Sequence, residues 1–355
     1  MEVKFKKLTL CLDMYGCPNR CRHCWVGHSP NGHMTSDDLE KTAAMFKPYA
    51  VEFEIFDWYR EPDFRNNYKE LWELRSRLSD TVTPHFELIS VWRIVRDSEY
   101  VKWLVSLGLK KAQLTLFGGE AATDHYTGRK GAYQDLLHAV DILIENRITP
   151  RMQVFVNKEN IGELPIVEKM ILDNRLSERC AEFGGDFSCF VHQGSCDGEN
   201  AKLYDVRITK DDLKMIPQLL TEHTLKHFRA KNLSEVFGQP EQELYQKLIA
   251  DTSTESYASD SPVLYVDNAY NVYPNISTPA PYWCLGNLKE SGVEEILRNY
   301  LSGKSTAQTV RRKIPLCEIV KRCGDPNSLR LFDEQDYVTY LLNQYCEKEQ
   351  VGMIK

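Results

Sequence analysis

Three cysteines stand close together near the start of the chain, in the stretch "MYGCPNRCRHCWVGH". Cys17, Cys21 and Cys24 have the spacing C-x3-C-x2-C, with no fourth cysteine alongside. Thiolates are soft ligands that suit zinc and iron–sulfur clusters, and a closed zinc site needs four ligands. A zinc site would therefore need His23 or His28 as its fourth ligand. An iron–sulfur cluster held by three cysteines instead keeps one iron open to a ligand that is not protein.

We favour the iron–sulfur cluster, because structural zinc sites usually combine two C-x2-C pairs and this chain has no second pair. The composition agrees with a site built from reduced thiols. Eleven cysteines occur in 355 residues with no export signal, which indicates a cytoplasmic protein without a disulfide framework. No apolar run is long enough for a membrane span. The net charge of −7 and the lack of a dense Lys/Arg tract disfavour a nucleic-acid partner.

The first 225 residues alternate short apolar runs with helical patterns. The expected strands cover 7–15, 50–58, 85–92, 111–117, 151–156 and 182–192, and the helices after them cover 35–46, 66–78, 98–108, 131–146, 163–174 and 209–223. Six strand–helix units imply parallel strands with right-handed crossovers, so we expect an α/β fold, an open partial (β/α)6 barrel over residues 1–225. Ligands bind at the carboxyl ends of such strands, where the three-cysteine loop follows the first strand.

Residues 226–355 have a different rhythm and are expected to form a small α+β C-terminal extension that caps the barrel. The stretch 261–274 is typical of a hairpin turning at Asp267-Asn268-Ala269. A turn and a helix are expected over 283–301, and a last helix over 333–348. Residues 225–260 give no clear pattern.

A C-x3-C-x2-C loop after the first strand of a partial barrel resembles the radical S-adenosylmethionine (radical SAM) superfamily. The resemblance implies that Cys17, Cys21 and Cys24 hold an oxygen-sensitive [4Fe–4S] cluster whose open iron is chelated by the amino and carboxylate groups of SAM. It further implies a reductant such as flavodoxin or ferredoxin. One electron from the reduced cluster then splits a carbon–sulfur bond of SAM, and the resulting 5′-deoxyadenosyl radical abstracts hydrogen from a substrate.

The resemblance also assigns residues to SAM. His23 takes the place of an aromatic residue near the adenine, and Glu61 in "WYREP" matches the acid of the family's G-G-E-P motif, although both glycines are absent. In "QLTLFGGEAATDHYTGRKGAY", Thr115 would approach the ribose or carboxylate, and Arg129 would clamp the SAM carboxylate.

Two further residues are candidates for contact with substrate. Glu120 follows a glycine pair and either faces substrate or is a solvated acid at the start of a helix. Cys189 lies in the sixth expected strand, where a thiol could return a hydrogen atom to a substrate radical, as epimerases of the family do. A buried structural thiol is the favoured interpretation of Cys189.

The tail resembles the SPASM or twitch extensions that carry auxiliary iron–sulfur clusters in many radical SAM enzymes. Asn275 stands where those extensions usually place a cysteine, so an auxiliary cluster is allowed by the resemblance but not favoured. Trp283 and Tyr282 are expected to cover the barrel mouth. Four cysteines remain downstream: Cys284, Cys317, Cys323 and Cys346.

Three functions follow from these patterns. The first is a radical SAM enzyme that acts on a small polar metabolite, and the second is the same chemistry on a ribosomal peptide. The absence of a leader-binding module before Lys7 favours the small molecule. The third is a non-enzymatic zinc or iron–sulfur protein that binds a partner or transfers electrons. An electron carrier would need four cysteines and no open iron, which disfavours it.

Overall fold

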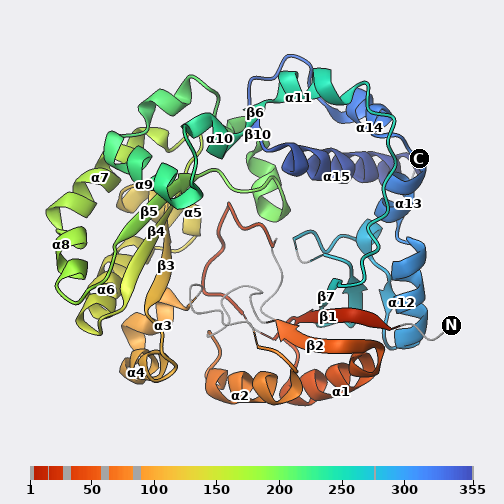
Figure 1. The fold of residues 1–355 in the computed structure, drawn as a ribbon, viewed down its shortest axis with the longest axis horizontal. Coiled ribbons are helices and arrows are strands. Elements are labelled where there is room, and N and C mark those ends of the chain that lie inside the picture. The colour runs from red at the N-terminus through yellow and green to blue at the C-terminus, as the bar shows by residue number, and fades with distance from the viewer. Residues whose placement is uncertain are drawn as a thin grey trace.

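The computed structural model describes residues 4–14, 16–26, 33–56, 64–82, 89–275 and 277–353, with side chains to 349. Its strands form two main sheets that lie on opposite sides of the molecule's centre (Figure 1). The segment after the first strand, which carries the three cysteines, runs between the sheets.

The first sheet has the strand order β2-β1-β7-β8-β9. It comprises β1 (Phe5–Leu12), β2 (Ala50–Phe56), β7 (Val263–Val266), β8 (Asn271–Tyr273) and β9 (Gly286–Asn287). β2 and β7 both run parallel to β1, which places Leu10 opposite Ile55 on one side and Leu264 on the other. β7 and β8 form the predicted antiparallel hairpin. The tail therefore supplies β7, one of the two strands that pair with β1, instead of lying apart from the barrel.

The second sheet is parallel, in the order β3-β4-β5. It comprises β3 (Lys111–Leu116), β4 (Thr149–Phe155) and β5 (Ser188–His192). Together, the parallel strands of the two sheets confirm the expected α/β fold with a partial barrel. The outer face of the second sheet packs on helices through a large apolar core that includes Leu114, Val154 and Val191.

The helices of the barrel region connect these strands. They are α1 (Ser36–Phe46), α2 (Tyr68–Leu78), α3 (Val91–Arg96), α4 (Ser98–Ser106), α5 (Glu120–Thr127), α6 (Ala132–Glu145), α7 (Leu164–Asp173), α8 (Leu176–Ala181) and α9 (Gln218–Phe228). α1 begins where the sequence predicts, because Thr35 and Asp38 form a reciprocal capping box. None of the described helices is long and apolar enough to cross a membrane.

Two sequence expectations need correction. In the strand expected over 85–92, the described part forms no strand: Ser90 caps α3, whose first residue is Val91, and 85–88 lie outside the described residues. The helix expected over 209–223 instead breaks at Pro217, and α9 begins after it. Proline lacks an N–H and disfavours helical backbone at the residue before it, which explains the break.

The tail adds short elements around one long helix. They are α10 (Leu233–Phe237), β6 (Gln239–Pro240), α11 (Glu241–Leu248), α12 (Gly292–Ser302), α13 (Thr306–Lys313), α14 (Leu316–Cys323), β10 (Leu331–Phe332) and α15 (Glu334–Met353). α15 runs toward the right in the upper half of the view in Figure 1, below α11. Asp336 of α15 pairs with Arg207, which follows β5 in the chain.

Candidate active site

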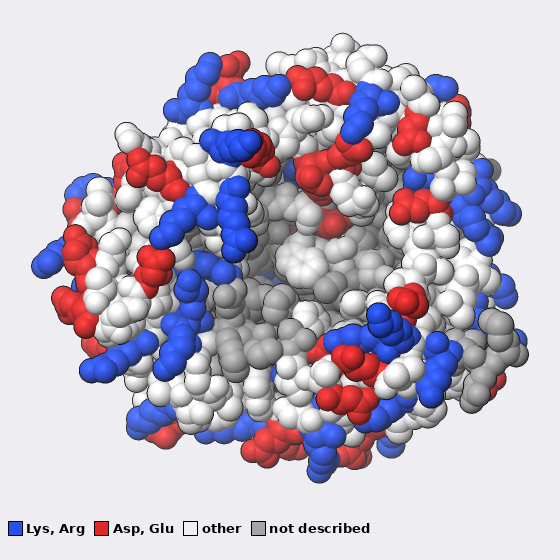
Figure 2. Space-filling view, viewed as in Figure 1, with Lys and Arg blue, Asp and Glu red and all other residues white. Residues whose placement is uncertain are grey.

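A cavity of about 1340 Å³ lies between the two sheets. Figure 2 shows the face of the molecule hollowed at its centre. The lining of the cavity includes the cysteine loop, strands of both sheets, and the tail segments around Asn275 and Asp336. The cavity is therefore enclosed by barrel and tail together.

The cysteine loop is fixed to the second side of the barrel through α5. The backbone N–H of Arg20 donates to Thr127 O at 2.8 Å, and that of Arg22 donates to Tyr126 O at 2.9 Å. Gly128, at φ +64°, permits this approach, since a Cβ there would meet Arg20 O at 2.9 Å. The loop thus follows β1 of one sheet and is tied to the helix that follows β3 of the other.

Cys17, Cys21 and Cys24 all line the cavity and are partly exposed. Within the described ranges, no three His, Cys, Asp or Glu side chains gather closely enough to hold one metal ion. A tetrahedral zinc site requires such convergence on a single ion, whereas a [4Fe–4S] cluster binds each thiolate through a different iron. Three soft thiolates that line one cavity can serve as the ligands of such a cluster.

His23 lines the cavity between two aromatic rings. Its ring centroid lies 4.7 Å from Phe117 in an edge arrangement and 4.9 Å from Phe155. Burial, with a smaller effect of nearby His192, lowers the pKa of His23 to about 3, so the imidazole is neutral. Its Nδ1 is buried and has no hydrogen-bond partner in the part of the chain that the structure describes. The ring can therefore exchange a hydrogen bond with a ligand in the cavity.

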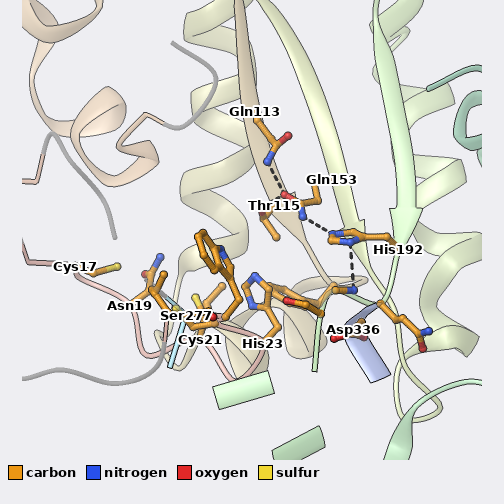
Figure 3. A pocket seen from close by; sticks show the side chains of 18 of the residues that line it. Cys17, Asn19, Cys21, His23, Gln113, Thr115, Gln153, His192, Ser277 and Asp336 are labelled. Atoms are coloured by element: carbon orange, nitrogen blue, oxygen red, sulfur yellow. Dashed lines mark hydrogen bonds between the residues drawn. The ribbon is translucent and has the colours of Figure 1, made fainter. Parts of the chain in front are cut away.

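The second sheet presents a polar wall to the cavity (Figure 3). Arg151 donates to Gln113 Oε1, with Nε at 3.1 Å, and Gln113 Nε2 donates to Gln153 Oε1 at 2.5 Å. The Thr115 hydroxyl donates to the same oxygen at 3.2 Å, and the Gln153 amide contacts His192 Nε2. One connected row of hydrogen bonds thus crosses β3, β4 and β5.

His192 ends this row. The Gly194 N–H lies 3.2 Å from His192 Nδ1, while the Gln153 amide nitrogen contacts its Nε2. Burial, followed by the charge of His227, lowers the pKa of His192 to about 4. His192 is therefore a neutral hydrogen-bonding group at neutral pH.

Sequence analysis missed this wall, although a signal for it exists. Gln113, Thr115, Arg151, Gln153 and His192 occupy alternate positions of strands whose other residues are buried and apolar. Alternation places such residues on one face of a sheet. It also missed a buried acid in the first sheet, Glu54, whose carboxylate pairs with Lys7 Nζ at 2.8 Å beside the cavity. Glu54, and then Glu52, raise the pKa of Lys7.

The residues expected to bind SAM have different outcomes. Thr115 and Arg129 both line the cavity. Arg129 Nε donates to Asn19 Oδ1 at 2.8 Å, and its Nη1 pairs with Asp135 at 2.5 Å, so the guanidinium also braces the cysteine loop. Glu61 lies outside the described residues.

The two candidate substrate residues do not reach the cavity. Glu120 is exposed in the first turn of α5 and accepts a hydrogen bond from Gln134 at 3.2 Å, which corresponds to its solvated-acid alternative. Cys189 points into the apolar core behind β5, and burial raises its pKa to about 12. Adjacent strand residues face opposite sides, so His192 faces the cavity while Cys189 does not.

The tail brings one of its three expected residues to the cavity, and the two aromatic residues expected to cover the barrel mouth do not line it. Asn275 lines it, whereas Trp283 and Tyr282 are buried in the core of the tail. The Cys284 thiol donates to Gly286 O at 3.7 Å, and Cys317, Cys323 and Cys346 lie on α14 and α15. Whether the tail holds an auxiliary cluster stays a prediction.

Comparison with known proteins adds independent findings. Residues 12–170 match the family model described as the radical SAM superfamily. A comparison with curated proteins gives no match. Among solved structures, "Native anSMEcpe with bound AdoMet" is similar with a TM-score of 0.51 and 14% identity, covering 98% of each chain. "Native anSMEcpe with bound AdoMet and Cp18Cys peptide" has the same TM-score, identity and coverage. At this identity the two structures establish the fold alone.

The family match begins at the end of β1 and includes the cysteine loop, α5 and both SAM candidates of the β3 region. The three thiols are suited to hold a cluster of four irons with one iron open to SAM, and the cavity beside them has room for SAM. Residues 12–170 are the radical SAM region of this chain, and the protein is an enzyme that uses S-adenosylmethionine and a [4Fe–4S] cluster.

Proposed function

We propose that the enzyme abstracts hydrogen from a polar substrate held against the wall formed by Gln113, Gln153 and His192. The observation that carries this proposal is that the wall and the three cysteines line the same cavity. Figure 3 shows Cys17 and Cys21 together with the wall. Amide and imidazole groups recognise hydroxyl, amine and amide groups of a ligand. A small polar metabolite, such as a sugar, nucleoside or amino-acid derivative, is the first substrate class to test.

In this proposal each residue of the chain has a defined task. Cys17, Cys21 and Cys24 hold the cluster, and Arg129 pairs with the SAM carboxylate by exchanging part of its contact with Asp135. Thr115 and His23 contact the nucleoside part of SAM, and Glu61 accepts hydrogen bonds from its amino group. When bound, the cluster and SAM supply the 5′-deoxyadenosyl radical, with the electron delivered by a reductant such as flavodoxin or ferredoxin. Such a protein would work in the cytoplasm, where thiols stay reduced.

A segment of a ribosomal peptide is the second candidate, and the size of the cavity favours it. Sites for one ligand usually occupy about 300–1,000 Å³. The cavity of about 1340 Å³ therefore has room for SAM and a second ligand of considerable size. The similar anSMEcpe structure with bound Cp18Cys peptide gives this candidate further support.

Labelled substrate pools test both candidates. The anaerobically reconstituted enzyme is incubated with SAM, dithionite and either deuterated metabolites or deuterated peptides, and deuterium in 5′-deoxyadenosine is measured by mass spectrometry. Transfer from the metabolite pool supports the first candidate, and transfer from the peptide pool alone supports the second. Transfer from neither pool, in an enzyme that still cleaves SAM, would contradict the proposal of a polar substrate.

Iron analysis of the same samples tests the tail. We infer a single cluster, so the reconstituted chain should contain about four irons, whereas an auxiliary cluster would raise the number to about eight. A value near eight that falls to four after replacement of the tail cysteines would overturn the single-cluster proposal. Cys180→Ala is the control, because Cys180 is buried in the outer core, away from both regions.

A further inference from the structure

A second, smaller pocket of about 270 Å³ lies beside the main cavity and shares Pro274, Asn275 and Ser277 with it. We call it the side pocket. Its remaining walls are Asp197, Tyr257, Thr278, Trp283, Thr339 and Asn343. It includes no residue that the preceding sections assign to SAM or to the cluster.

Two polar atoms of the side pocket are buried and have no hydrogen-bond partner among the described residues: Asn275 Nδ2 and Thr278 Oγ1. The orientation of the Asn275 amide is fixed, because its Oδ1 accepts from the Thr278 N–H at 2.7 Å. Buried polar groups in folded proteins are almost always paired. The unpaired Nδ2 therefore offers a donor to an acceptor atom that a ligand would bring.

Asp197 provides the opposite polarity. Its Oδ1 accepts from Asn343 Nδ2 at a long 3.5 Å. Burial and the nearby carboxylate of Asp336 raise the pKa of Asp197 to about 7, against the opposing effects of Ser277 and Arg207. A ligand N–H or O–H would stabilise its charged form.

The side pocket also has two aromatic side chains in its lining. Trp283 Nε1 donates to Asn343 Oδ1 at 2.9 Å, and its ring packs edge-on to Tyr257 with centroids 5.5 Å apart. A fixed wall of this kind sets the size of the group that can enter.

We propose that the side pocket is a specificity subsite for a neutral group that both donates and accepts hydrogen bonds, namely a hydroxyl or a primary carboxamide of the substrate. An ammonium would face the like-polarised Asn275 Nδ2, and a carboxylate would face Asp197. A neutral donor–acceptor group satisfies both. The inference rests on the proposed function only in identifying the ligand as substrate, since the binding itself requires no turnover.

Soaking distinguishes the possible occupants. Crystals of the reconstituted full chain are soaked separately with acetamide, methylammonium and acetate at equal concentration. The expected result is acetamide alone in the side pocket, with its oxygen accepting from Asn275 Nδ2 and the Thr278 hydroxyl and its amide nitrogen donating to Asp197. Ordered water in every soak, or a charged probe in place of acetamide, would overturn the proposal, whatever the outcome of the turnover assay.

A matched pair of variants tests the contact in solution. Thr278→Val keeps the shape but removes the unpaired hydroxyl, so Tm should stay level or rise while the affinity for acetamide falls about three- to tenfold, the effect of one hydrogen bond. Thr306→Val, at the exposed start of α13, should bind acetamide as the wild type does. Affinity is measured by saturation-transfer NMR. Wild-type affinity in Thr278→Val would contradict the assignment.

Discussion

Arg207 joins the barrel to the tail, and its removal should strongly destabilise the protein. Its side chain is 4% exposed, pairs with Asp336 at 3.2 Å, donates to Leu331 O at 3.1 Å and lies 3.9 Å above the Phe332 ring. Removing one partner of a buried ion pair leaves an uncompensated charge and costs about 3–5 kcal/mol. That loss is a large part of the 5–15 kcal/mol of typical domain stability. Arg207→Ala should therefore lower the free energy of unfolding by about this amount, measured by urea titration with circular dichroism.

A control variant and a pH dependence follow from the same physical argument. Arg77→Ala removes an exposed pair with Glu40 and should cost less than about 1 kcal/mol. Burial already raises the pKa of Asp336, and loss of Arg207 raises it further. Protonation then relieves the unpaired charge, so the deficit of Arg207→Ala should shrink as pH falls from 7 toward 5. A deficit below about 1 kcal/mol, or one that grows as pH falls, would refute this reasoning.

Three further predictions concern the site. Replacing Cys17, Cys21 and Cys24 together by alanine should remove essentially all reconstituted iron, and iron retained at about four per chain would contradict the ligand assignment. Arg129→Ala should weaken SAM binding about ten- to hundredfold in calorimetry without changing the cluster spectrum, and unchanged affinity would remove Arg129 from the site. Because the pKa of Asp197 is raised to about 7, folding stability should fall as pH rises from about 4 to about 7. Asp197→Asn should lose this pH-dependent component of the free energy of unfolding. Urea titrations at both pH values would contradict the prediction if the variant showed the same dependence on pH as the wild type.

The elements that sequence predicted well are those whose pattern is local. Buried runs such as 111–117, the capping box at Thr35 and the hairpin turn after β7 each carry their own signal within a few residues. The pairing of β7 with β1 carries no such signal. It joins residues about 250 positions apart, so the tail was expected to cap the barrel and not to share its first sheet.

The site divides in the same way. The cysteine spacing is local and predicted the cofactor. Which side of a strand faces the cavity depends on the register of the sheet, and a shift of one residue in register exchanges the two faces. Cys189 shows the consequence: a shift of one position along β5 separates the outer core from the cavity. Asp197 and Thr278 come together only through tertiary packing, so no pattern in the sequence marks the side pocket.

The geometry also assigns the tail a part in selecting substrate. The cysteine loop, fixed against α5, forms one wall of the cavity, and the β3–β5 row forms another. The remaining walls include Asn275, Ser277, Asp333 and Asp336, which all belong to the tail. Since the barrel supplies the groups assigned to the cluster and SAM, differences in the tail can change which substrate binds without disturbing the cofactors. Specificity in this enzyme is therefore expected to depend on the tail together with the β3–β5 row, and the reaction with SAM on the barrel.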